Sequence, residues 1–204
     1  SSHLSGDTFS FQELVDGEFV MSLSDGMGSG SRACKESEMV IELIEKFLEA
    51  GFSKETAIRM MNSAMVIRGE DDLFSTVDIS ALNLYDGNCT FYKIGASATF
   101  IRRADCVECL ISENLPVGVY HSVEIEKTTR SLSDGDFIIM MSDGVLEYLN
   151  VPHPEEAMES IIAGIDTNHP GRFAKQLLDQ VLVYTDGKVS DDMTVLVAAV
   201  WEKA

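Results

Sequence analysis

The sequence predicts an α+β fold, because its strand patterns and its helix patterns occupy separate stretches of the chain. Residues 76–141 show period-two alternation with turn signals, whereas residues 33–68 and 157–181 carry apolar residues at helical spacing. With 204 residues, of which 45% are apolar, the chain can close a sizeable hydrophobic core. We therefore expect one domain over residues 1–204.

The first predicted elements are a strand and two helices. The apolar run Phe19-Val20-Met21-Ser22-Leu23 ends abruptly in Ser24-Asp25-Gly26, as a buried strand does where it enters a tight turn. Gly51 is the expected stop of the first helix, and Ser53 the expected cap of the second. Their apolar faces consist of Met39, Val40, Leu43, Ile44, Phe47 and Leu48, and of Ala57, Ile58, Met61, Ala64 and Met65.

The next predicted elements form a meander of antiparallel strands from Thr76 to Met141. The run Phe137-Ile138-Ile139-Met140-Met141 is apolar on both faces, which indicates a central strand, and it leads into Ser142-Asp143-Gly144. Two amphipathic helices follow, over residues 157–165 and 173–181, and a strand from Thr194 to Val200 closes the chain.

Charge narrows the classes of partner. Acidic side chains outnumber basic ones by 34 to 15, so the surface should repel nucleic acid and anionic lipid; the excess also serves solubility.

Four irregularly spaced cysteines fit reduced thiols in a cytosol. No apolar stretch reaches the roughly 20 residues that cross a bilayer, and no signal peptide is evident. Ser1-Ser2-His3 resembles an expression remnant, so we expect a cytoplasmic piece of a longer protein.

Aspartates recur beside apolar strands. Asp25 follows Leu23-Ser24, Asp143 follows Met141-Ser142, and Asp191-Asp192 precede Met193-Thr194-Val195. Carboxylates gathered at buried strand ends repel each other unless a cation neutralises them, and Mg²⁺ and Mn²⁺ prefer oxygen ligands. The alternative for any single Asp-Gly is an ordinary turn.

A glycine-rich loop strengthens the cation interpretation. In Asp25-Gly26-Met27-Gly28-Ser29-Gly30, small residues let the backbone approach a ligand before a helix opens. No lysine follows at the position that a Walker-type nucleotide loop requires, so nucleotide binding is discounted.

The motifs, in this order, resemble those of the metal-dependent type 2C (PPM) family of protein serine/threonine phosphatases, over the whole chain. Within that family, the chain is similar to the bacterial phosphatases of sporulation and of stress-response partner switching. The resemblance rests on Leu4-Ser5-Gly6-Asp7, Ser24-Asp25-Gly26-Met27-Gly28, Ser75-Thr76-Val77-Asp78, Asn114-Leu115-Pro116-Val117-Gly118, Ile139-Met140-Met141-Ser142-Asp143-Gly144 and Asp191-Asp192-Met193-Thr194-Val195.

The resemblance implies a four-layer αββα sandwich of two antiparallel β-sheets flanked by helix pairs, with two Mn²⁺ or Mg²⁺ ions that activate a water molecule against phosphorus. By correspondence, Asp25 would bridge both ions, the carbonyl of Gly26 would bind one, and Asp143 and Asp191 would hold the other. Asp7 would complete a site through water. Asp191 is preferred to Asp192 because the family places its ligand first.

The implied substrate is the phosphoserine of an anti-sigma factor antagonist in a spore-forming bacterium, whose dephosphorylation would promote sigma factor release. The parent protein would be membrane-anchored and could form homo-oligomers. Alternatives are a stress-response phosphatase with another antagonist as substrate, or a catalytically silent metal-binding interaction domain.

The chain departs from many relatives at two positions. Met27 stands where they carry a histidine proposed as general acid, and their phosphate-gripping N-terminal arginine is not evident. We hypothesise that the helices between Ala33 and Arg68, which follow Asp25, act as a switch; the alternative is that they only cover the sheet.

Overall fold

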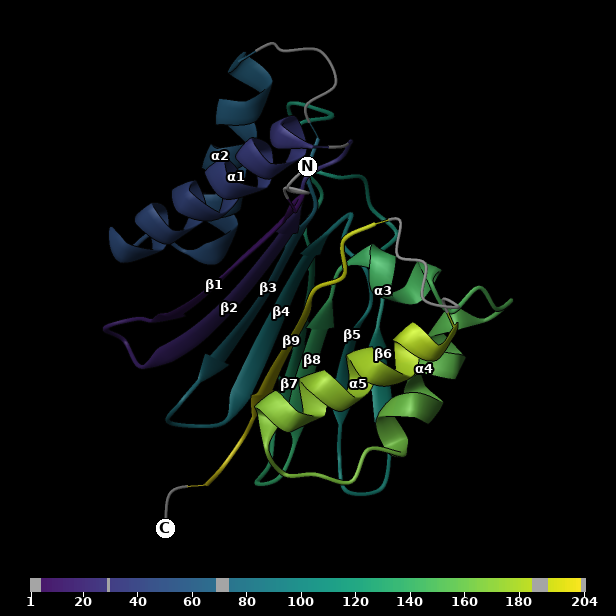
Figure 1. The fold of residues 1–204 in the computed structure, drawn as a ribbon. Helices are drawn as coiled ribbons and strands as arrows, with labels where there is room; N and C mark the ends of the chain where they lie inside the picture. The colour runs from purple at the N-terminus through teal and green to yellow at the C-terminus, as the bar shows by residue number, and fades with distance from the viewer. Residues whose placement is uncertain (1–4, 29, 69–73, 185–190, 203–204) are drawn as a thin grey trace. The chain divides into compact units, whose positions relative to one another are not determined.

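The computed structural model describes residues 5–28, 30–68, 74–184 and 191–202. The expected expression remnant Ser1-Ser2-His3, the motif residue Leu4 and the loop residue Ser29 lie outside these residues. The chain divides into two compact units, Ser1–Ala96 with Ser112–Ser131, and Ser97–Ile111 with Leu132–Ala204. Each unit has its own sheet and its own helices (Figure 1).

The first unit contains a five-stranded sheet in the order β1-β2-β3-β4-β7. Its strands are β1 (Asp7–Glu13), β2 (Glu18–Asp25), β3 (Val77–Asn83), β4 (Asn88–Ile94) and β7 (Glu126–Ser131). Every neighbouring pair is antiparallel, as the alternation predicts. The β1–β2 register places Asp7 directly opposite Asp25.

A helix pair covers one face of this sheet. Helix α1 (Ser31–Glu49) and helix α2 (Lys54–Arg68) lie side by side over the strands (Figure 1). Their apolar faces pack in one buried cluster with side chains of β2, β3 and β4, among them Val40, Ile44, Ile58, Met61, Val20, Val77, Ile79 and Ile94. Gly51 follows the end of α1 at a left-handed φ of 84°, which confirms it as the helix stop.

The second unit contains a four-stranded antiparallel sheet in the order β6-β5-β8-β9. Its strands are β5 (Thr99–Arg102), β6 (Val107–Leu110), β8 (Phe137–Met141) and β9 (Val195–Ala199). Strand β8 lies between β5 and β9, so its predicted central place is confirmed. Helices α4 (Pro154–Ala163) and α5 (Pro170–Tyr184) pack on this unit's strands around Phe100, Phe137, Ile162 and Phe173.

The α+β class, with two antiparallel sheets and their helix pairs, is confirmed. The sequence expectations omitted β1, in which only Phe9 and Phe11 mark the alternation, and the five-residue helix α3 (Asp143–Glu147). Within the described ranges, no helix is both long enough and apolar enough to cross a membrane.

The cap of α2 gives a stability prediction. The hydroxyl oxygen of Ser53 accepts a hydrogen bond from the backbone N–H of Thr56 at 3.2 Å, which satisfies one of the donors left open in the first turn. Ser53→Ala should lower the free energy of unfolding by about 1 kcal/mol.

The control is Ser63→Ala, in the interior of the same helix, where the hydroxyl donates to the carbonyl of Arg59 at 2.9 Å. Alanine is the better helix former there, so this variant should match the parent or exceed it. Urea unfolding followed by circular dichroism compares the two; equal losses from both variants would contradict the capping role.

Candidate metal centre

Two carboxylates face each other at one end of the first unit's sheet. Asp7 is the first residue of β1, Asp25 is the last residue of β2, and the two are cross-strand partners. Both are half-buried. Like charges directly opposite on a sheet destabilise it, and a cation between them reverses that effect.

The backbone of Asp25 is held by Ser75 and Thr76, the two residues directly before β3. Its N–H donates to Thr76 Oγ1 at 2.9 Å, and its carbonyl accepts from Thr76 N–H at 2.9 Å and from Ser75 Oγ at 2.8 Å. Ser24, which is buried, donates through its hydroxyl to the carbonyl of Thr76 at 2.7 Å. These bonds fix the position from which the Asp25 carboxylate projects.

Gly26 occupies a place that no side chain fits. A Cβ there would lie 2.1 Å from the carbonyl oxygen of Ala33, near the start of α1. Its N–H donates to the carbonyl of Gly6 at 3.1 Å. A Cβ on Gly6 would in turn meet the Gly26 carbonyl oxygen at 3.4 Å and Asp25 Oδ1 at 3.6 Å, so both oxygens border the space that glycine leaves open.

In the second unit, the backbone segment that begins with Asp143 lies against the segment that contains Asp191. Asp143 is the first residue of α3, directly after β8. A Cβ on Gly144 would lie 2.2 Å from the carbonyl oxygen of Asp192, so the start of α3 lies against the Asp191-Asp192 backbone. The two segments are tied by Ser142, whose N–H donates to the Thr194 carbonyl and whose Oγ accepts from Thr194 N–H, both at 3.0 Å.

Asp191 and Asp192 differ in their surroundings. Asp191 is exposed, its N–H donates to the hydroxyl of Tyr148, and its Oδ1 accepts from the N–H of Asp192 at 2.9 Å. Asp192 is half-buried, with its carbonyl against Gly144. The side chain of Asp191 thus stands at the open side of this turn.

The predicted ligands therefore form two groups, Asp7 with Asp25 and Gly26 in one unit, and Asp143 with Asp191 in the other. Over the residues with described positions, no three His, Cys, Asp or Glu side chains are gathered closely enough to form a metal site by themselves. His121, His153 and His169 are exposed, and His3 lies outside the described residues.

The chemistry of the donors fits a hard divalent cation. All predicted donors are carboxylate or carbonyl oxygens, the ligands that Mg²⁺ and Mn²⁺ prefer over thiolates and imidazoles. The gap beside Gly6, bordered by two of these oxygens, is consistent with that assignment.

Sequence reasoning did not identify the residues that hold these ligands. Thr76 and Ser75 bind the Asp25 backbone, and Tyr148 binds the Asp191 backbone. In the sequence, Ser75 and Thr76 could have been noticed only as two hydroxyl residues directly before a buried strand. Met27, at the position of the family's histidine, is 50% exposed and its N–H donates to the Phe74 carbonyl at 2.9 Å.

Comparison with known proteins gives consistent matches. The profile of the family described as stage II sporulation protein E (SpoIIE) matches residues 15–201. Stage II sporulation protein E of Bacillus subtilis (strain 168) is 38% identical over 198 residues, covering 97% of this chain and 24% of that protein. The chain thus spans about a quarter of that relative's length. Phosphoserine phosphatase RsbX of the same organism is 26% identical, covering 94% of this chain and 85% of that protein.

Solved structures agree with these matches. The PP2C phosphatase domain of SpoIIE from Bacillus subtilis, solved with a fragment of its regulatory domain, superimposes with a TM-score of 0.90 at 38% identity, covering 97% of this chain and 59% of that chain. A manganese-presoaked structure of the same phosphatase domain superimposes with a TM-score of 0.63 at 34% identity, covering 98% of this chain and 89% of that chain.

The close approach at Gly144 gives a second prediction. Gly144→Ala places a methyl group 2.2 Å from the Asp192 carbonyl oxygen, so the turn that carries Asp191 must move. We expect a loss of about 1–3 kcal/mol in the free energy of unfolding.

Gly164→Ala is the matched control, because Gly164 has an ordinary φ of −82° and its nearest atom to a new Cβ is 3.5 Å away. Thermal unfolding should show a lower Tm for Gly144→Ala and an unchanged or higher Tm for Gly164→Ala. An unchanged Tm for Gly144→Ala would contradict the described contact.

Proposed function

This chain belongs to the stage II sporulation protein E family, and on that premise we propose that it is the phosphatase domain of a longer protein that hydrolyses phosphoserine on a protein substrate. The observation that carries the proposal is the pairing of Asp7 with Asp25 beside Gly26, together with the close approach of Gly144, next to Asp143, to the Asp191-Asp192 backbone. The phosphoserine phosphatase activity in the name of the relative RsbX supports the reaction type.

The proposed ligands follow the two groups. Asp25 would bridge two Mn²⁺ or Mg²⁺ ions, with the Gly26 carbonyl on one ion and Asp7 acting on that side through water. Asp143 and Asp191 would hold the other ion. When bound, the two cations supply an activated water that attacks phosphorus. The manganese soak of the related SpoIIE domain supports the choice of metal.

The chain's own contribution is rigid placement of these oxygens. Ser75 and Thr76 fix the Asp25 backbone, so a bound cation would not have to order that part of the main chain. Met27 has no proton to donate, so the serine oxygen must take its proton from water or from another side chain when the P–O bond breaks.

We further propose that the substrate is the phosphoserine of an anti-sigma factor antagonist, and that its dephosphorylation promotes sigma factor release during sporulation. The sporulation family of this chain and the phosphoserine substrate in the name of RsbX support that choice. The parent protein would be membrane-anchored, with this domain in the cytoplasm.

Replacement of the bridging ligand tests the reaction. Asp25→Asn keeps the side chain's size and removes its charge, so manganese-dependent hydrolysis of p-nitrophenyl phosphate and of a phosphoserine peptide should fall about 100-fold or more. The control is Asp16→Asn, in the β1–β2 turn, where an exposed aspartate should be replaceable at full activity.

A parent protein with no manganese-dependent hydrolysis would contradict the proposed function. Equal rates in the parent and in Asp25→Asn would contradict the ligand assignment while leaving the reaction in place.

The neighbouring aspartates allow a direct comparison at the second group. Asp191→Asn should raise the manganese concentration needed for half-maximal activity by about tenfold or more, because it removes a ligand. Asp192→Asn should have a smaller effect, since Asp192 is half-buried with its carbonyl against Gly144. A larger effect from Asp192→Asn would reverse the assignment between the two residues.

A further inference from the structure

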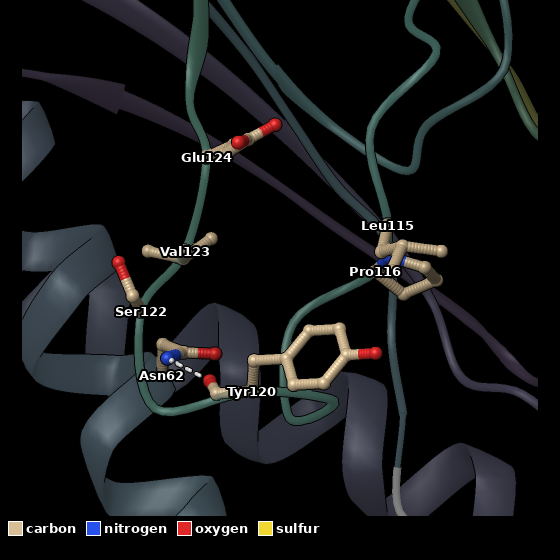
Figure 2. A pocket seen from close by; sticks show the side chains of 7 residues that line it. All are labelled: Asn62, Leu115, Pro116, Tyr120, Ser122, Val123 and Glu124. Carbon is tan, nitrogen blue, oxygen red and sulfur yellow. Dashed lines mark hydrogen bonds between the residues drawn. The ribbon is translucent and has the colours of Figure 1, made fainter.

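A small pocket lies in the first unit between α2 and the segment that follows Leu115 (Figure 2). Its volume is about 190 Å³, and its walls include Asn62, Leu115, Pro116, Tyr120, Val123 and Glu124. Pockets for drug-sized ligands and cofactors begin at about 300 Å³, so this one is sized for a single side chain.

The walls of the pocket are held in place by one buried amide. Asn62, which is 1% exposed, donates through Nδ2 to the Tyr120 carbonyl and accepts at Oδ1 from Gly118 N–H, both at 2.9 Å. Figure 2 shows this amide with its hydrogen bond to the Tyr120 carbonyl oxygen. Both polar atoms of the Asn62 amide form hydrogen bonds with the loop backbone. The loop is therefore preorganised, and a ligand would not have to order it.

Two large side chains on the walls of the pocket are unusually exposed, on walls that also include the polar Ser122 and Glu124. Leu115 is 55% exposed and Tyr120 is 64% exposed, although both are large side chains that a core would normally bury. Tyrosine is one of the residues enriched at protein recognition sites. The pocket therefore has the properties of a subsite for an apolar side chain.

The loop that forms one wall of the pocket is linked to the proposed metal ligand Gly26 through Ser75, within the same unit. Val117 N–H donates to the Ser75 carbonyl at 2.9 Å, Ser75 N–H donates back at 3.3 Å, and Ser75 also forms a β-bridge with Gly26. Two strand spacings separate Gly26 from Val117, which is roughly 10 Å. An extended peptide covers that distance in about three residues.

Charge distinguishes among occupants. The segment 112–126 contains Glu113, Glu124 and Glu126 and no lysine or arginine, and the chain carries a net charge of −19. A second copy of this chain or an anionic lipid surface would meet like charge there. A neutral or basic stretch of a substrate protein would not.

We propose that this pocket binds an aliphatic side chain of the phosphoprotein substrate, about three residues from the phosphoserine. The proposal rests on the proposed function, since the phosphoserine would be placed beside Gly26. It assigns Leu115 and Tyr120 to substrate selection and Asn62 to positioning of the loop.

Synthetic phosphoserine peptides test the proposal. Each peptide contains one phosphoserine and one leucine, and all its remaining positions are alanine. Across the series, the leucine lies two, three, four or five residues before or after the phosphoserine. The parent protein with manganese should show a kcat/KM about tenfold higher for leucine than for alanine at one or two neighbouring positions. Fluorescence anisotropy without metal should show the same preference as a lower Kd.

Leu115→Ala and Tyr120→Ala should each bring the leucine-to-alanine ratio close to one. The control is Leu84→Ala, in the β3–β4 turn of the same unit, where a leucine of similar exposure, 52%, lies outside the pocket. That variant should keep both the ratio and the hydrolysis of p-nitrophenyl phosphate.

A parent protein with no leucine preference in Kd or in kcat/KM would overturn the subsite, as would a preference that survives both pocket substitutions. Absence of all manganese-dependent hydrolysis would overturn the proposed function instead, and the metal-free Kd values would then decide on the pocket alone.

Discussion

The structure of the candidate site depends on one constraint, the register that sets Asp7 opposite Asp25. Two carboxylates at neighbouring positions on a sheet raise the energy of the fold unless a positive charge lies between them. A shift of one residue in that register would send one carboxylate to the other face of the sheet. The register of the hairpin therefore decides whether the two carboxylates of the proposed cation site lie side by side.

The surrounding residues hold the backbone of the proposed ligands. Ser75 and Thr76 bind the Asp25 main chain, and glycine at position 26 allows the turn to pass within contact of Ala33. In the second unit, Gly144 plays the corresponding part against Asp192. Such close backbone contacts leave little freedom, so the oxygens are positioned before any ligand arrives.

The sequence predicted the elements whose periodicity is strong, and it failed where the signal is tertiary. Strand β8 and helices α1 and α2 follow from long apolar patterns, whereas β1 has only Phe9 and Phe11 and depends on pairing with β2. The strand-end aspartates were visible because aspartate beside a buried run is unusual. Their supports, such as Tyr148, were not, because a hydrogen bond between residues 43 positions apart leaves no local pattern.

The motif Asn114-Leu115-Pro116-Val117-Gly118 is held to the first unit's strands by hydrogen bonds and close packing. Asn114 accepts from Gly95 N–H at 2.7 Å and donates to the carbonyls of Lys93 and Glu124 at 3.0 and 2.8 Å. Gly95 has a φ of 60°, and a Cβ at this position would lie 2.7 Å from the backbone nitrogen of Pro116, so only glycine leaves room for the proline. These contacts fix the start of the loop, and Asn62 fixes its middle. One segment thus bridges to Ser75, which in turn bridges to Gly26, and it carries Leu115 two residues before Val117. The proposed metal site and the proposed substrate pocket would therefore share a single support.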